Sequence, residues 1–215
     1  MTLRRCGWMT GLVCLLTLAF SVRPAAAADM TGGVEVGANF TTVGLGGTEA
    51  SGAHSDIRGG VLFGVFAQLP ITDSVSIQPE LVYSQKHFKI SAPGFRANED
   101  LEVMELPVLL RATVVKPDRN PGFYVVMGPS FGYRVRARET KRIENGKPQP
   151  DGDNSAGFNT ARWNVIGGAG ITKGKWDVEG RYEAGLRNLI RENSGEGDLT
   201  VRERSFSVLF RWRFK

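Results

Sequence analysis

The last stretch of this chain, residues 205–214, alternates strictly between large apolar side chains and mostly polar ones. Its large apolar members are Phe206, Val208, Phe210, Trp212 and Phe214. A period of two places these side chains on one face of a β-strand and leaves Arg211 and Arg213 on the other face. Five bulky side chains on one face need a cover, and we predict that membrane lipid provides it.

Seven earlier stretches show the same alternation, less cleanly in the second, where Leu62 and Phe66 oppose the apolar face. The predicted strands are residues 34–42, 60–69, 74–86, 102–114, 123–136, 162–171, 176–187 and 205–214. Their number is even, and each can reach the roughly 9–11 residues with which a tilted strand crosses a bilayer. The pattern predicts an all-β fold, an eight-stranded antiparallel up-and-down transmembrane β-barrel.

The connections between these strands are expected to alternate in length. Short turns are predicted at 70–73, 115–121 and 172–175, and long polar loops at 44–57, 87–101, 137–161 and 188–201. Short turns at one end and long loops at the other are typical of outer-membrane barrels. Both termini then lie at the short-turn end, in the periplasm, and the final strand pairs with the first, Val34 to Phe40, so that no free edge remains.

A soluble lipocalin-like barrel would share the alternation but would turn its apolar face inward. Two features favour lipid outside. The polar face carries charges of both signs that can fill a narrow lumen, namely Glu80, Glu105, Asp177, Glu179 and Glu183 with Lys86, Arg111, Arg134, Arg181, Arg211 and Arg213. Aromatic residues gather near the strand ends, as in membrane-interface girdles: Phe40, Tyr83, Tyr133, Trp163 and Tyr182 toward the long loops, and Phe123, Trp176, Trp212 and Phe214 toward the short turns.

Two local expectations follow from this arrangement. Pro79, Pro107 and Pro129 each remove a ladder donor within a predicted strand, so we expect bulges or locally broken pairing there. A charge introduced at Val208 would lie near the middle of the bilayer and is expected to cost about 2–4 kcal/mol. A charge at Ser207, on the luminal face, is expected to be tolerated.

Residues 1–28 have the features of a secretory signal peptide that is cleaved, leaving 29–215 as the barrel domain. Arg4 and Arg5 precede an apolar run at 11–20, and small residues follow at 25–28. Both cysteines of the chain lie in this segment. It also holds three of the 27 basic residues and none of the 22 acidic ones, so the remainder carries 24 against 22, a net charge of +2. The basic character of the whole chain therefore does not indicate a nucleic-acid partner.

Several motifs resemble those of the PorT/OmpX-like outer-membrane β-barrel family. Two contain proline, at 77–86 (IQPELVYSQK) and 104–111 (MELPVLLR), and two others are 128–133 (GPSFGY) and 181–186 (RYEAGL). The resemblance implies an eight-stranded barrel integral to the outer membrane, but it does not imply a single activity. It also implies that the C-terminal strand is read by the barrel assembly machinery, although Lys215 follows the aromatic Phe214 on which such chains often end.

Candidate chemical sites are weak. Ser84 and His87, with Glu80 further along, could form a nucleophile–base pair, but their spacing directs Ser84 toward the lumen and His87 outward. His54 is isolated, and no metal-ligand spacing is present. The acidic turn 151–154 lacks the pattern of a calcium loop, and the glycines at 167–170 are followed by no helix that would indicate a nucleotide site. We predict no catalytic, cofactor-binding or metal-binding residues.

The sequence therefore favours an integral outer-membrane protein with a structural or cell-surface interaction role and a polar, plugged lumen. Its partners would be outer-membrane lipid and the assembly machinery; the ligand of the long loops stays unknown. A narrow porin-like channel for small solutes is the alternative, because luminal charges can also line a pore. A lipid A-modifying outer-membrane enzyme is the less favoured third possibility.

Overall fold

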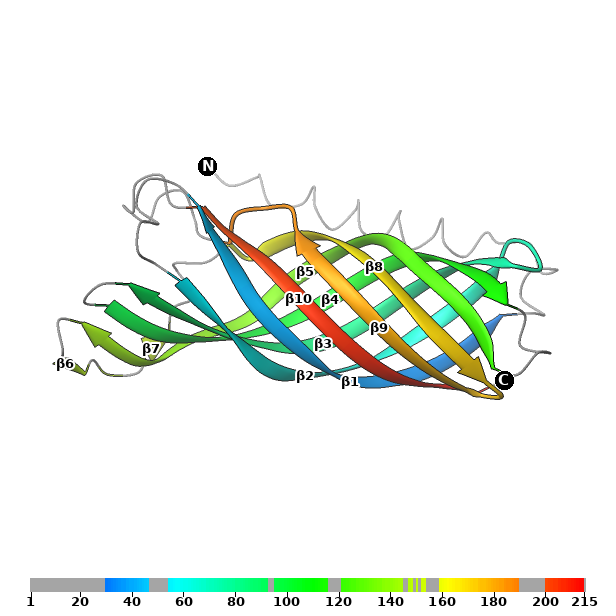
Figure 1. The fold of residues 1–215 in the computed structure, drawn as a ribbon, viewed down its shortest axis with the longest axis horizontal. Helices are drawn as coiled ribbons and strands as arrows, with labels where there is room; N and C mark the ends of the chain where they lie inside the picture. Colours follow the sequence, from blue (N-terminus) through cyan, green and yellow to red (C-terminus); the bar gives the residue numbers. More distant parts are fainter. Residues whose placement is uncertain are drawn as a thin grey trace, which may run out of the picture.

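In the computed structural model, the stretches of alternating sequence form the eight long strands of a β-barrel (Figure 1). The structure describes residues 30–46, 54–92, 95–115, 121–144, 147–148, 150, 152–153, 159–189 and 200–214. The strands are β1 (Thr31–Gly46), β2 (His54–Pro70), β3 (Val75–Ala92), β4 (Phe95–Val115), β5 (Gly122–Glu144), β6 (Lys147–Pro148), β7 (Gly152–Asp153), β8 (Ala161–Lys173), β9 (Trp176–Gly185) and β10 (Thr200–Arg213). The two-residue strands β6 and β7 pair only with the end of β5.

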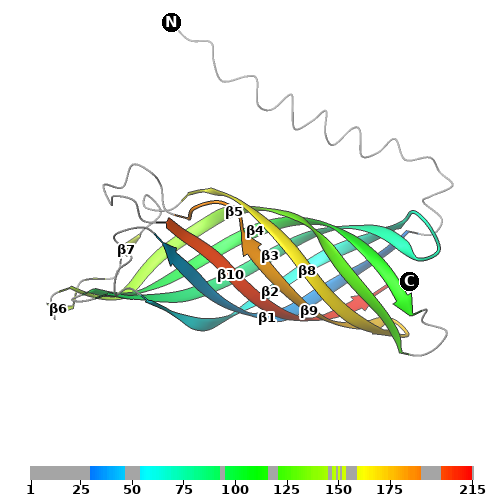
Figure 2. The same cartoon turned by 45° about the horizontal axis from the view of Figure 1, so that its top comes forward.

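The barrel closes between its first and last long strands. The hydrogen-bonded order is β4-β3-β2-β1-β10-β9-β8-β5, and β4 pairs with β5 to complete the circle. In the seam, β1 and β10 are antiparallel in unbroken register from Gly33 opposite Arg213 to Gly46 opposite Thr200. The predicted fold class and the predicted seam are both confirmed. Thr31 and Arg213 lie at the same end of the barrel, called here the short-turn end (Figures 1 and 2).

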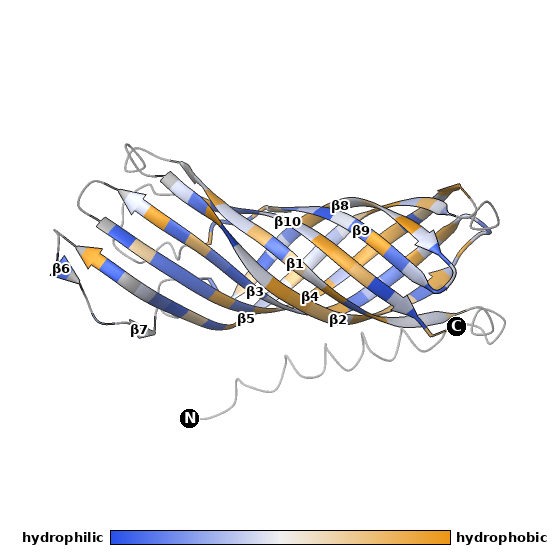
Figure 3. Cartoon of the chain, turned by 60° about the horizontal axis from the view of Figure 1, so that its bottom comes forward, coloured by the Kyte–Doolittle hydropathy of each residue, from blue (hydrophilic) through white to orange (hydrophobic). Residues whose placement is uncertain are grey.

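The barrel exposes apolar side chains on its outer wall and buries charged ones inside, the reverse of the arrangement in a soluble barrel. The apolar residues of each strand are exposed on the outer wall, as for Val36 and Phe210, whereas charged residues such as Glu35 and Arg211 are buried inside. Figure 3 shows the resulting alternation of hydrophobic and hydrophilic positions along the strands. The predicted aromatic girdles lie outward, with Phe131 packed edge-on against Trp163 at one end and Trp176 stacked on Trp212 at the other. No helix among the described residues is long and apolar enough to cross a membrane.

The three prolines interrupt pairing without shifting it. Pairing of β2 with β3 lapses between Phe66 opposite Glu80 and Leu69 opposite Ile77, beside Pro79, and the register is the same on both sides. Similar gaps lie beside Pro107 in the β3–β4 pair and beside Pro129 in the β4–β5 pair. The expected broken pairs are therefore found. The register shifts lie elsewhere. The extra residue is in β2 at 57–62, in β5 at 140–143 and 134–136, and in β4 at 113–115.

The long-loop predictions at 87–101 and 137–161 are wrong in part, because strand pairing continues through much of both segments. We call residues 85–92 of β3, 95–102 of β4 and 136–144 of β5 the blade. Its base packs inside the barrel and pairs with residues 54–57 of β2, and its outer part extends the wall beyond the ends of the other strands (Figure 1). Cross-strand side-chain contacts accompany the continuation: His87 Nδ1 lies 2.6 Å from Asp100 Oδ1, and Lys89 Nζ lies 3.0 Å from Asp56 Oδ2. Residues 145–146, 149, 151 and 154–158 of the longest predicted loop, and residues 1–28, lie outside the described residues.

Two of the predicted short turns are described. Residues 71–74 connect β2 to β3, and Ile71 N and Thr72 N both donate to Val75 O, at 2.8 and 3.0 Å. Gly174 and Lys175 connect β8 to β9, and Gly174 has φ of +60°, a conformation that glycine adopts without steric cost. Most of the predicted turn at 115–121 lies outside the described residues.

Candidate functional site

The lumen contains a central charge cluster at mid-height, built by β1, β3, β9 and β10. Arg211 is fully buried and lies 3.0 Å from Glu35, 3.1 Å from Glu80 and 2.8 Å from Glu179. Arg181 makes a forked contact with Glu80, both distances 2.6 Å, and also pairs with Glu179. Three carboxylates thus share two guanidiniums, and the planar fork of arginine suits this bridging.

A second cluster centres on Lys86 and lies toward the end of the barrel opposite the short turns, called here the long-strand end. Its ammonium contacts three carboxylates, at 2.5 Å from Glu105, 2.9 Å from Glu183 and 2.8 Å from Glu203. Arg162 pairs with the other oxygen of Glu203. Lys86 donates hydrogen bonds to Glu105 and Glu183 and forms an ion pair with Glu203, so three carboxylates compensate this buried cation.

A third cluster closes the short-turn end. Arg111 donates to Asp177 at 2.9 Å and to Thr172 at 3.1 Å, and Arg213 lies 3.3 Å from Asp177. The Arg111 guanidinium stacks over the ring of Tyr124, 3.4 Å from its centroid. Tyr124 donates to Glu179 at 2.8 Å and so joins this cluster to the central one.

Charge is balanced across the three clusters and the adjacent Arg134. Among the described residues they hold seven acidic groups, Glu35, Glu80, Glu105, Asp177, Glu179, Glu183 and Glu203, and seven basic groups, Lys86, Arg111, Arg134, Arg162, Arg181, Arg211 and Arg213. Burying this many charges is tolerable only when each has partners of opposite sign. The arrangement can hold the wall rigid.

Apolar side chains separate and cover the charged layers. At the long-strand end, Phe88, Leu101, Val103 and Val201 are almost completely buried in one cluster that also includes Val43, Ala137 and Leu189. Smaller groups, Leu62 with Val82 and Leu209, and Leu109 with Tyr124, Val126 and Ile166, lie lower in the interior. The two-residue period places each of these inward, but it does not reveal that they form layers.

The eleven charged residues that the sequence pattern placed on the luminal face all belong to these clusters or lie beside them. The pattern did not identify Glu35, Arg162 and Glu203 as members. Glu35 and Arg162 occupy inward positions of predicted strands, so the alternation itself could have found them. Glu203 precedes the predicted start of the last strand, because the apolar residues that mark this strand begin only at Phe206.

The candidate nucleophile–base pair is divided by the barrel wall. Ser84 is buried in the lumen, where Asn39 Nδ2 donates to its hydroxyl at 3.0 Å. His87 is half-buried on the outward face of the blade, beside Asp100. The side chain of His54 lies outside the described residues, as do Asp151, Asn154 and the side chain of Asp153 in the acidic turn. Among the described residues no group of three potential metal ligands gathers.

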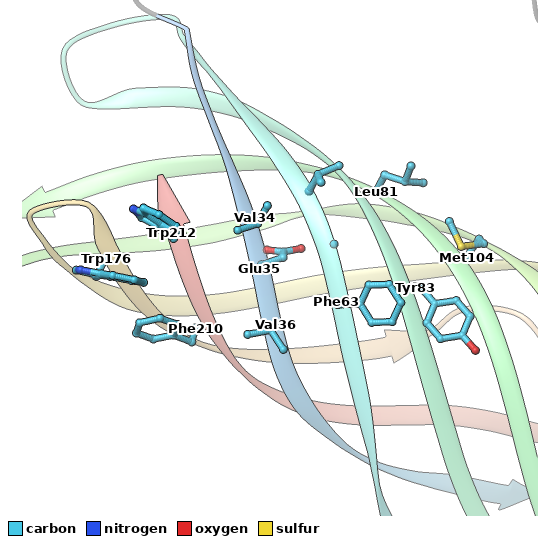
Figure 4. A pocket seen from close by; sticks show the side chains of 12 residues that line it. Val34, Glu35, Val36, Phe63, Leu81, Tyr83, Met104, Trp176, Phe210 and Trp212 are labelled. Atoms are coloured by element: carbon cyan, nitrogen blue, oxygen red, sulfur yellow. The ribbon is translucent and has the colours of Figure 1, made fainter. Parts of the chain in front are cut away.

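A hollow of about 630 Å³ lies on the outer wall rather than in the lumen. Figure 4 shows Trp176, Phe210 and Trp212 at one side of it, Phe63, Tyr83 and Met104 at the other, and Val34 and Val36 between them. Small residues at the barrel waist, including Gly64, leave this depression between bulky neighbours. Its lining is apolar, which suits hydrocarbon rather than a polar solute.

A family model described as the outer membrane protein beta-barrel domain matches residues 28–191. The chain belongs to this family. It is therefore an outer-membrane β-barrel, and the apolar wall described above is its membrane-facing surface. No curated protein matches the sequence.

Three solved structures illustrate its similarity to other barrels. OprG from Pseudomonas aeruginosa is 11% identical, with 86% of this chain and 94% of that chain covered and a TM-score of 0.48. Neisserial surface protein A is 12% identical, with 85% and 97% covered and a TM-score of 0.46. Ail of Yersinia pestis is 10% identical, with 85% and 98% covered and a TM-score of 0.41. At such identities and scores, none of these similarities bears on the activity of this chain.

Proposed function

We propose that this outer-membrane β-barrel has a structural or cell-surface interaction role and neither conducts solutes nor catalyses a reaction. The observation that carries the proposal is the filled lumen. Three charge clusters and an apolar cluster follow one another along the interior. Inside the lumen, the pocket bordered by Leu62, Val82 and Ser207 has a volume of about 20 Å³, roughly one water molecule. A pocket of about 150 Å³, bordered by Gln68, Arg111 and Arg213, lies at the short-turn mouth.

The blade supports the interaction part of the proposal. It extends beyond the membrane-facing belt, and paired charges hold it as a sheet rather than as separate loops. Binding residues are often carried on such projections from a rigid scaffold. A narrow porin-like channel is the alternative, and it would require the luminal charges to rearrange or hydrate. A lipid A-modifying enzyme has less support, because Ser84 and His87 lie on opposite sides of the wall.

We further propose that the chain is made with a cleaved signal at residues 1–28 and resembles the PorT/OmpX-like group within its family. In this proposal bilayer lipid covers the outward face, and the assembly machinery reads β10, whose outward row runs from Phe206 to Phe214. The blade then faces the cell exterior, and the turn at Gly174 and Lys175 faces the periplasm.

Conductance tests the closed lumen. Purified barrel reconstituted in planar bilayers is expected to give no stable conductance steps, while the same sample shows the heat-modifiable migration of a folded barrel. Stable steps from a folded sample would favour the channel instead.

Site-specific labelling tests the orientation of the blade. Lys89→Cys is expected to react with a membrane-impermeant maleimide on intact cells, and Lys175→Cys only after the outer membrane is permeabilised, both compared with the parent chain. Reaction at Lys175→Cys alone on intact cells would show that the barrel is inverted.

A further inference from the structure

Two arginines stand on the membrane-facing side of β10, immediately beyond its apolar row. Arg202 and Arg204 are both exposed and share the outward face with Phe206. Directly below them a row of outward aromatic rings crosses three strands, because Phe206 pairs with Phe40 on β1 and with Tyr182 on β9. An aromatic row of this kind marks the boundary between hydrocarbon and headgroups, so the two guanidiniums lie at headgroup level.

The wall beside these arginines is open. Arg204 is paired with Thr42 on β1 and Ala184 on β9, both small residues. Its side chain extends over β1, where a Cβ placed on Gly44 would lie 3.8 Å from the guanidinium. Among the residues that the structure describes, no bulky neighbour therefore prevents a ligand from reaching these two cations from the bilayer.

Arg202 and Arg204 stand two residues apart on one strand, without a neighbouring acid on the outward face that the structure describes. Some outward bases of the blade do have acidic partners: His87 with Asp100, Lys89 with Asp56, and Arg136 with Glu102. Neither Arg202 nor Arg204 has an ion-pair partner among the described residues. The described acidic residues of β1, β9 and β10 are all buried in the lumen; they are Glu35, Asp177, Glu179, Glu183 and Glu203.

We propose that Arg202 and Arg204 bind the phosphorylated headgroup of an outer-leaflet lipid. The proposal rests on the orientation given above, with the blade outside the cell. A guanidinium donates two parallel hydrogen bonds to phosphate and remains charged at a membrane surface. Each arginine near an anionic surface contributes about a five-fold gain in binding.

The acyl chains of that lipid have a path down the wall. From Arg204 to Phe210 the strand spans six residues, about 20 Å. This path passes Phe206 and Val208 and reaches the hollow lined by Val34, Val36, Phe210 and Trp212 (Figure 4). The arginines thus face the headgroup and the apolar hollow faces the acyl chains of one lipid along the seam between β1 and β10.

Lipid selectivity tests the site. The barrel is reconstituted in phosphatidylcholine vesicles with a trace of spin-labelled phosphatidic acid or spin-labelled phosphatidylcholine, and the motionally restricted fraction of each is measured. We expect several-fold selectivity for phosphatidic acid, partial loss in Arg204→Gln, and near-complete loss in Arg202→Gln/Arg204→Gln. The matched control Lys89→Gln/Arg136→Gln removes the same charge from the blade and is expected to retain the selectivity.

The outcomes separate the possible explanations. Absence of selectivity in the wild type, or equal loss in the control, would overturn the site. Removal of the selectivity by inorganic phosphate at constant ionic strength would show that a free anion, not a lipid, is the ligand. Every sample is first shown to be a folded barrel by heat-modifiable migration. A folded barrel without selectivity counts against the headgroup site alone, whereas a sample that restricts no lipid of either kind counts against membrane placement itself.

Discussion

Replacing Arg211 by methionine tests whether water is excluded from the luminal charge network and whether its ion pairs stabilise the fold. Methionine keeps the unbranched stem of the side chain but removes the cation that contacts Glu35, Glu80 and Glu179. Arg181 would then face three buried carboxylates alone. The substitution also removes the contact of the guanidinium with the ring of Phe66, whose centroid lies 4.0 Å away.

The expected loss in the free energy of unfolding is about 3–5 kcal/mol, the range found when one member of a buried ion pair is deleted. The magnitude comes from leaving carboxylates buried without compensation rather than from the lost attraction. The double variant Arg211→Met/Glu35→Gln removes one of those carboxylates as well. It is expected to recover a large part of the loss, because one guanidinium then faces two carboxylates and the cluster has the same net charge, −1, as in the parent chain.

Urea unfolding in detergent micelles, followed by tryptophan fluorescence and by heat-modifiable migration, measures these differences. Arg204→Met provides a matched control, since it makes the same substitution on the same strand but at an exposed outward position. It is expected to change stability by no more than about 0.5 kcal/mol. If Arg211→Met costs less than about 1 kcal/mol, or the double variant shows no recovery, water must solvate the carboxylates and the dry lumen is refuted.

Two further predictions compare neighbouring positions. Val208→Lys places a charge in the middle of the outward row and is expected to cost about 2–4 kcal/mol in urea unfolding. Ser207 borders a luminal space of only about 20 Å³, so Ser207→Asp is expected to be tolerated better than a lysine at that position. Equal loss of stability from charges at positions 207 and 208 would show that the two faces are assigned wrongly. Gly170→Ala is expected to cost about 1–3 kcal/mol by overpacking, because its Cβ would collide with the buried ring of Tyr124. Gly167→Ala on the same strand has open space around the new Cβ and serves as the control. Similar melting temperatures of the two variants would contradict this packing argument.

Much of the fold could be read from alternation. Period two assigned outward and inward faces in all eight strands, and the outward position of Phe210 and inward position of Arg211 show that the assignment holds even in the closing strand. The blade could not be read in the same way. Outside the membrane the outward residues, such as His87 and Lys89, are polar on a strand whose other face holds only a few apolar residues, so the contrast that marks a strand fades.

The sequence by itself determined the side of the wall on which each residue lies, because successive side chains of a strand point in opposite directions. Only the tertiary structure decided which luminal charges meet. Lys86 contacts Glu183, 97 positions along the chain, and Arg211 contacts Glu80, 131 positions away. Such pairings depend on the height of each residue in the barrel. That height is set by the stagger and tilt with which eight strands close, a property of the whole sheet that no single strand carries.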